Sequence, residues 1–216
     1  MRGNEIMKTI MLMLTSLLFA GCSVLGKRDA AEPPYEMLKH DGPFEVRRYG
    51  PMVIAETILD EENYSTASGK GFNRLAGYIF GKNRSKSSIS MTAPVLQERR
   101  SEKISMTTPV LQQRNKGGWT MAFVLPEGFT LASAPEPLDP EVKLREVPPA
   151  TVAVIRFSGL HSSANLEKYG RKLQAWLEKH GYHALSEPRL ASYDPPWTIP
   201  FLRRNEVHIR ITTDQD

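Results

Sequence analysis

The segment Ile89-Ser-Met-Thr-Ala-Pro-Val-Leu-Gln-Glu-Arg99 returns fifteen positions later as Ile104-Ser-Met-Thr-Thr-Pro-Val-Leu-Gln-Gln-Arg114, with nine of the eleven residues unchanged. A match of this length marks a duplicated structural unit. In each copy, Ile and Met alternate with Ser and Thr, which predicts a half-buried strand with its apolar side chains on one face. Pro94 and Pro109 cannot donate to a ladder, so each strand is expected to be an edge, kink or bulge at its proline. The charged residues 98–103 between the copies are expected to form a hairpin loop.

Further strand patterns precede and follow the repeat. In the segment 44–49, Val46 is expected on one face of the strand and Arg47 on the other, and their neighbours alternate in the same way. An Asp-Gly-Pro turn joins this segment to the strand before it. The segments with strand character are 35–40, 44–49, 52–58, 119–125, 142–147, 151–157, 189–193 and 206–211.

The first of two amphipathic helices is predicted from a cap at Ser65-Thr66 to about Phe80. Its apolar face consists of Phe72, Leu75, Ala76 and Ile79. Gly69, Gly71 and Gly77 weaken the intrinsic helical tendency, so this helix needs tertiary packing. Glycines here also permit the close approach of another backbone or of a flat ligand.

The second helix is predicted over Ala164 to His180, with Ser162 or Ser163 as its cap and Gly181 at its end. The two helices lie about 100 residues apart, each between groups of strands. This order predicts an α+β fold with an internal pseudo-repeat, in which both helices pack against a largely antiparallel sheet.

The N-terminal segment predicts export and lipidation. The apolar run 9–20 follows Arg2 and Lys8 and is too short to span a bilayer, which is typical of a signal peptide. It ends in Leu18-Phe19-Ala20-Gly21-Cys22, which resembles a bacterial lipobox whose cysteine receives a diacylglyceryl group. The expected organisation is a signal peptide at 1–21, a lipidated cysteine with a flexible tether at 22–34, and a folded domain at 35–212. Ser23 resembles an outer-membrane sorting signal, so we expect a lipoprotein of the cell envelope that faces the periplasm.

Composition argues against several classes of function. Net charge is +4 without a block of five or six basic residues, which disfavours nucleic acid as a partner. Cys22 is the only cysteine, so its lipidation would leave no thiol for a disulfide, a metal site or a nucleophile. The chain lacks the Gly-x-Ser-x-Gly, His-Glu-x-x-His and complete phosphate-loop motifs, and we therefore expect a binding protein rather than an enzyme.

Three separated motifs resemble the SOUL haem-binding protein family. They are Phe44-Glu-Val-Arg-Arg-Tyr-Gly50, the doubled Ile-Ser-Met-Thr-x-Pro-Val unit, and Tyr193-Asp-Pro-Pro-Trp197 followed by Arg203-Arg-Asn-Glu206. The doubled unit resembles the bacterial lipoprotein branch. The resemblance implies a distorted antiparallel β-barrel of about eight strands with two helices, built from two similar halves. It also implies non-covalent binding of haem or a related tetrapyrrole in an apolar cleft beside the first helix, without catalysis.

The resemblance suggests which residues bind the tetrapyrrole. Phe72, Leu75 and Ile79 are candidates for an apolar wall, although such a helical stripe is more often core. Arg74 and Arg203 are candidate propionate partners, together with Lys82 and Arg204, and Tyr193 belongs to the third motif. No axial iron ligand is predicted, and some family members carry a histidine where this chain has Arg48. An alternative is an envelope binding or scaffold protein for another apolar or amphiphilic small ligand. The oligomeric state stays open.

Overall fold

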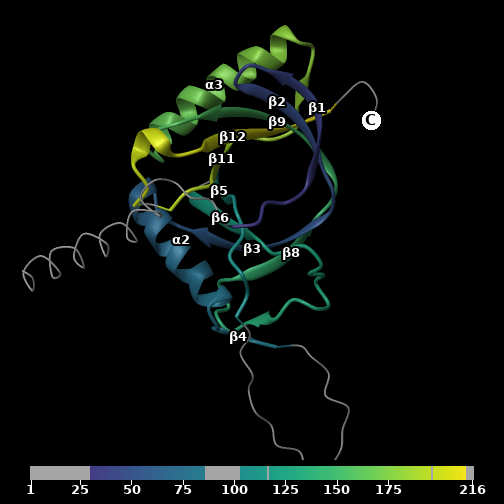
Figure 1. Cartoon of the computed structure of the whole chain (residues 1–216). Coiled ribbons are helices and arrows are strands. Elements are labelled where there is room, and N and C mark those ends of the chain that lie inside the picture. The colour runs from purple at the N-terminus through teal and green to yellow at the C-terminus, as the bar shows by residue number, and fades with distance from the viewer. Residues whose placement is uncertain (1–29, 86–102, 116, 196, 213–216) are drawn as a thin grey trace, which may run out of the picture.

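The computed structural model describes residues 30–85, 103–115, 117–195 and 197–212. They form an antiparallel sheet that curls into a half-barrel, with two helices packed on one of its faces (Figure 1). This arrangement confirms the predicted α+β class. None of the helices in the described part of the chain has the length and apolarity that a bilayer crossing requires.

Nine strands follow one path across the sheet, and the short strand β10 (His183–Ala184) pairs with β12 beside it. In spatial order the path is β1 (Tyr35–Asp41), β2 (Phe44–Tyr49), β9 (Ala150–Phe157), β12 (Asn205–Thr212), β11 (Arg189–Ser192), β5 (Val110–Asn115), β6 (Gly118–Val124), β3 (Met52–Leu59) and β8 (Lys143–Val147). Two further short strands, β4 (Asn83–Arg84) and β7 (Glu136–Pro137), pair with each other.

The strand order has the predicted pseudo-two-fold character. From the seam between β5 and β11, one direction runs through β6 to β3, and the other runs through β12 to β9. The outer strands β2 and β8 are exchanged between the halves. β2 precedes β3 in the chain but pairs with β9, whereas β8 precedes β9 but pairs with β3. Each half therefore completes the sheet of the other, which ties both into one folded unit.

The helices α2 (Tyr64–Ile79) and α3 (Ser163–Lys179) lie close to their predicted positions. Ser162 caps α3 as predicted, because its hydroxyl accepts the Asn165 N–H at 3.2 Å. The predicted cap of α2 is wrong by two residues. Asn63 holds that position in extended backbone, and its Oδ1 accepts the Thr66 N–H at 3.1 Å. Asparagine is at least as good a cap as serine, and the helix begins two residues earlier than predicted from Ser65.

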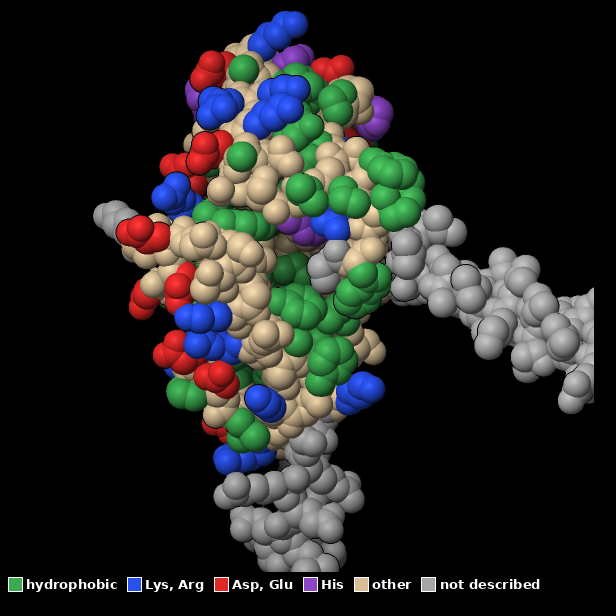
Figure 2. Space-filling model, turned by 90° about the vertical axis from the view of Figure 1, so that its left-hand side faces the viewer, with side chains coloured by type: hydrophobic (Ala, Val, Ile, Leu, Met, Phe, Trp, Pro, Cys, Tyr) green, Lys and Arg blue, Asp and Glu red, His purple; other side chains and the backbone are tan. Residues whose placement is uncertain are grey.

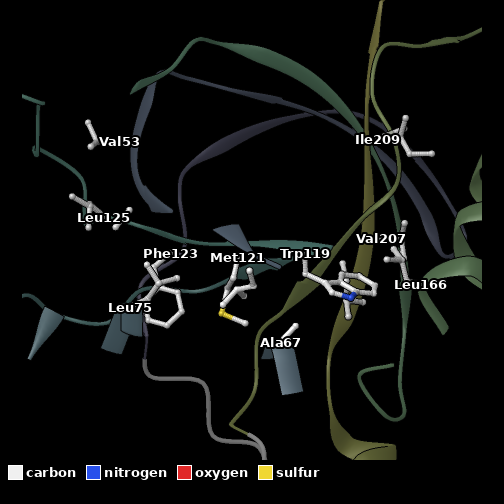
Figure 3. Packing of buried hydrophobic residues seen from close by; sticks show 14 of the residues in the cluster. Val53, Ala67, Leu75, Trp119, Met121, Phe123, Leu125, Leu166, Val207 and Ile209 are labelled. Carbon is white, nitrogen blue, oxygen red and sulfur yellow. The ribbon is translucent and has the colours of Figure 1, made fainter. Parts of the chain in front are cut away.

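The main core lies between the helices and the sheet (Figure 3). Trp119, Met121 and Phe123 point from β6 toward α2, as the alternation of their segment predicts. Leu75 and Ile79 meet them from α2 and are at most 1% exposed. The apolar stripe of the first helix is therefore core.

Of the two repeat copies, the second lies within the described residues. The first copy, 89–99, and most of the predicted hairpin loop lie outside the described residues. In the second copy the strand begins only at Val110, so the prediction of a strand from Ile104 is wrong. The Ile104 N–H binds Ile79 O at the end of α2, and the Thr108 N–H binds Ala31 O, so neither joins a neighbouring strand. Pro109 has no N–H, which restricts a continuous ladder to the residues after it.

Candidate functional site

A buried polar network lies on the sheet face that the helices leave uncovered. Its centre is the fully buried carboxylate of Glu206 on β12. The two terminal guanidinium nitrogens of Arg47, Nη1 and Nη2, donate to it at 2.8 and 2.9 Å, and the Tyr193 hydroxyl donates at 2.7 Å. The His208 Nε2 lies 2.8 Å away and Arg204 Nε 2.9 Å away. Because an ionised carboxylate only accepts hydrogen bonds, Nε2 carries the histidine proton.

The surroundings fix the charge of Glu206 and of His208. Burial opposes ionisation of Glu206, but the hydrogen bonds from His208 and Arg47 outweigh it and hold its pKa well below the ordinary value of 4.5. Burial lowers the pKa of His208 below 6.5, against the pull of Glu206. At neutral pH, Glu206 is therefore ionised and His208 is neutral.

The network has no uncompensated negative charge. Its second carboxylate, Glu45, accepts from Arg47 Nε at 2.7 Å and from Arg156 at 3.3 Å. Glu45 and Glu206 together face three arginines, namely Arg47, Arg156 and Arg204. A buried carboxylate that is paired in this way does not attract a cationic ligand. The charge available to a ligand on this face must come from other side chains.

A cavity of about 210 Å³ opens on the same face. Residues from β8, at one end of the strand path, and from β2, the second strand from the other end, both line it, so the sheet curls toward this side. Most of the wall is apolar, and it consists mainly of Met52, Ile54, Pro109, Leu111, Val124, Val147, Pro148, Ala150 and Val152. Polar groups enter at Tyr49, Gln113, Arg145, Ser186, Arg189, His208 and Arg210.

Arg189, at the start of β11, lines this cavity without an acidic partner. Within the described part of the chain, its side chain has no hydrogen bond and no ion pair. Burial, with the nearby charge of Arg210, lowers the pKa of Arg189 to about 10, so the guanidinium stays charged at neutral pH. The Arg189 side chain is partly buried, and a charge removed from much of its water is unfavourable unless it is paired. Arg189 therefore marks the place where an anionic group of a ligand gains most.

Two further arginines reach the same cavity. Arg145 on β8 is held by Glu56, with Nε–Oε1 and Nη2–Oε2 distances of 2.8 and 2.9 Å. Arg210 on β12 is exposed, and its backbone N–H binds the Ser186 hydroxyl at 3.0 Å. Planar guanidinium groups bind carboxylates through paired hydrogen bonds. The cavity thus combines apolar side chains with three arginines, which suits an amphiphilic carboxylate.

The candidate residues from the first helix do not line this cavity. Leu75 and Ile79 are core, and Phe72 packs edge-on against Phe123, with ring centres 5.6 Å apart. Arg74 donates to the Thr57 hydroxyl at 2.8 Å and pairs with Glu141 at 3.2 Å. These four side chains lie near one another on the helix side of the sheet, already engaged by the protein itself.

The remaining candidates are spread over three places. Tyr193 joins the polar network through Glu206 and has the guanidinium of Arg204 over its ring at 3.9 Å. Arg203 donates from Nε to Thr198 O at 2.7 Å, in the loop before β12. Cys22 lies outside the described residues.

Arg189 and the cavity were missed by reasoning from the sequence. The alternation of residues 189–193 puts Arg189, Ala191 and Tyr193 on one face, which was the available signal. The same rule separates His208 from Val207 and Ile209 on β12. Alternation does not tell whether the second face meets solvent or a cavity.

The side chains around the cavity were compared with those that bind metal ions in proteins. Among the described residues, no group of three or more His, Cys, Asp or Glu side chains is arranged to hold a metal ion. His208 is the histidine that lines the cavity, and its Nε2 is directed at Glu206. Arg48 faces away from the cavity and pairs with Glu36 at 2.8 Å.

Comparison with known proteins places the chain in a family. The model of the family "SOUL heme-binding protein" matches residues 30–210. Heme-binding protein 2 of Mus musculus is 37% identical over 62 residues, which is 29% of this chain and 30% of that protein. Heme-binding protein 2 of Homo sapiens is 28% identical over 140 residues, or 65% of this chain and 64% of that protein. The aligned chain thus spans less than two thirds of either relative.

Other similarities extend over more of the chain. Heme-binding protein 1 of Xenopus laevis is 26% identical over 165 residues, covering 76% of this chain and 81% of that protein. Among solved structures, the crystal structure of the EcmrR C-terminal domain matches with a TM-score of 0.52 at 12% identity, over 83% of this chain and 98% of that one. At such identity the likeness concerns the fold alone. The family match covers nearly all of the described residues, and the chain therefore belongs to the SOUL haem-binding protein family.

Proposed function

We propose that this protein binds haem or a related tetrapyrrole non-covalently, with a carboxylate-bearing edge of the ring in the cavity lined by Arg189. Family membership supports the class of ligand. The observation that carries the proposal is the unpaired guanidinium of Arg189 in the wall of a cavity that also has many apolar side chains. Propionate groups are anions on an apolar ring, so they match both features.

The size of the cavity limits how a tetrapyrrole fits. Pockets for drug-sized ligands typically measure about 300–1,000 Å³. The cavity here holds about 210 Å³, so it receives one edge of the ring and not the whole of it. Arg189, Arg145 and Arg210 would hold the propionates, and the apolar wall would contact the adjoining ring carbons. A bound haem supplies iron, and the residues of this chain hold and orient the carboxylates.

We also propose that the protein is attached to the cell envelope. The signal-peptide pattern of residues 1–21 and the lipobox-like Leu18-Phe19-Ala20-Gly21-Cys22 support an exported lipoprotein of the bacterial branch, in the outer membrane and facing the periplasm. Mass spectrometry of the mature protein should find acyl chains on Cys22. The substitution Cys22→Ser should remove the acyl chains and lower the share of the protein in the membrane fraction.

A hemin titration tests the binding proposal. A chain of residues 23–216, which lacks Cys22, should give a saturable shift of the Soret band at micromolar hemin. Charge-assisted hydrogen bonds contribute about 1.5–3 kcal/mol, so Arg189→Leu should weaken binding roughly 10- to 100-fold. Arg171→Leu is the matched control, because Arg171 is exposed on α3 and does not line the cavity. Equal affinities of the two variants would place the carboxylates elsewhere, and a non-saturable shift would refute haem binding.

A second ligand class is favoured by the small cavity volume. A single-chain amphiphile with one carboxylate fits about 210 Å³ better than a complete tetrapyrrole does. This alternative is an envelope binding protein for another amphiphilic small molecule. Native mass spectrometry of protein purified from its own envelope distinguishes the two classes by the mass of the molecule that remains bound.

A further inference from the structure

An exposed apolar patch lies at one end of the molecule, outside the cavity. It consists of Leu160, Trp197, Phe201 and Leu202, of which Trp197 is 62% and Phe201 71% exposed. Two of these residues belong to η1 (Pro200–Leu202), a short 3-10 helix. The side of the molecule that carries η1 in Figure 1 faces the viewer in Figure 2, where apolar side chains gather toward the upper right. Contiguous exposed apolar groups of this kind mark interaction surfaces.

The patch is held in a fixed shape by backbone and side-chain hydrogen bonds. The Gly159 N–H donates to Pro200 O at 2.9 Å, which joins the loop of Leu160 to η1. The Asn205 side chain donates to Gly159 O at 3.0 Å from the start of β12. The Leu202 N–H donates to Ile199 O at 2.9 Å within the turn. These hydrogen bonds therefore hold the patch together while its apolar side chains stay exposed to solvent.

The N-terminal end of the described chain lies beside this patch. Arg204, two residues after η1, pairs with Glu32 at 2.8 Å. Ala31 pairs in parallel with Thr107, and its carbonyl accepts the Thr108 N–H at 2.9 Å. Eight residue steps separate Cys22 from residue 30, and an extended chain spans at most about 3.6 Å per residue. The point where the chain enters the fold therefore stays within about 29 Å of Cys22.

We propose that the patch of Leu160, Trp197, Phe201 and Leu202 docks on the surface of the lipid bilayer. Tryptophan and phenylalanine suit the boundary between headgroups and acyl chains. The proposal rests on the lipid anchor at Cys22, because the short tether keeps this end of the molecule at the membrane. Docking would turn the half-barrel into one orientation relative to the bilayer, which attachment at Cys22 alone does not do.

Tryptophan fluorescence tests the docking. Trp119 and Trp176 are 2% and 6% exposed, so Trp197 is the tryptophan available to a lipid-borne quencher. The acylated full chain, reconstituted in phosphatidylethanolamine–phosphatidylglycerol vesicles, should be quenched by brominated acyl chains. The quenching should disappear in Trp197→Phe and fall several-fold in the double variant Phe201→Ser/Leu202→Ser. Phe80→Ser is the matched control, because Phe80 is 58% exposed at the end of α2, away from the patch, and should leave the quenching unchanged.

The outcomes separate the docking from the anchor. Acylated protein that shows no quenching, or a double variant that is quenched like the unaltered chain, overturns the docking while the anchor stands. Absence of acyl chains on Cys22 overturns the anchor, and docking is then decided by adding the Cys22→Ser chain to the same vesicles. Flotation of that chain should fall about 10-fold in the double variant, and no flotation of either form overturns the docking.

Discussion

Two neighbouring arginines of β2 show that burial decides how much an ion pair matters for stability. Arg47 is fully buried and donates to both Glu45 and Glu206, which lies 159 residues away. Arg48 is on the other face, where its side chain is 47% exposed and pairs with Glu36. Loss of one partner of a buried pair leaves an uncompensated charge, whereas an exposed pair is screened by water.

Arg47→Leu should lower the free energy of unfolding by about 3–5 kcal/mol, because two buried carboxylates lose their shared donor. Arg48→Leu, the matched control, should change it by about 0–1 kcal/mol. Urea denaturation followed by circular dichroism measures both. Similar losses in the two variants would contradict the assignment of Arg47 to a buried network.

His208 should make stability depend on pH. Its pKa in the folded chain lies below 6.5, so on acidification through 6.5 the unfolded chain takes up a proton that the folded chain does not. Stability should therefore fall below pH 6.5, by at most about 1.4 kcal/mol per pH unit for this group. His208→Gln should flatten the slope in denaturation series between pH 7 and 5. A residual slope is expected from His161, whose pKa burial also lowers.

The control for this prediction is His183→Gln. His183 is exposed in β10, so this variant measures the effect of a His→Gln change outside the buried network. A slope that is the same in His208→Gln and in the unaltered chain would show that His208 titrates as it does in the unfolded state.

At the scale of elements, the glycines of α2 divide by what they face. A Cβ atom at Gly71 would lie 2.8 Å from Leu59 Cδ1 and 3.1 Å from Met121 Sδ, so Gly71 lets the helix lie close to β3 and β6. A Cβ atom at Gly69 would have nothing within 4 Å. The close approach anticipated for these glycines is thus to the protein's own sheet, at Gly71.

Gly69→Ala should stabilise the protein by about 0.5–1 kcal/mol, because alanine is the better helix former and space is available. Gly71→Ala gains the same propensity but crowds buried side chains, and overpacking costs about 1–3 kcal/mol. Its net effect should be destabilising by up to about 2 kcal/mol. Thermal unfolding of the two single variants tests the difference, and two shifts of the same sign would contradict it.

At the scale of the whole molecule, the second repeat copy provides the seam between the halves. Its strand β5 pairs with β6 of its own half and with β11 of the other. The copy is therefore structural, and it contributes Pro109, Leu111 and Gln113 to the cavity wall.

Deletion of residues 100–114 should abolish cooperative unfolding, because it removes most of β5 and separates β6 from β11. Circular dichroism and a urea transition of the deleted chain measure this. A stable, cooperative deletion variant that binds hemin like the unaltered chain would show the second copy to be dispensable.

Much of the architecture follows from local pattern in the sequence. Alternation predicts the faces of the 44–49 and 119–125 strands, and the 3.6-residue period predicts both helices. The three motifs identify the family. The site does not follow in the same way, because the stripe of Phe72, Leu75 and Ile79 has the same pattern whether it faces a ligand or a sheet.

The sequence by itself determined the class of fold, the internal repeat, the capped helices and the strand faces, since each depends on residues a few positions apart. Only the tertiary structure decided which faces meet. The exchange of β2 and β8 between the halves brings Arg47 to Glu206 and leaves Arg189 without an acid in an apolar cavity. Pairings across more than 100 residues depend on strand order, and strand order is a property of the whole chain.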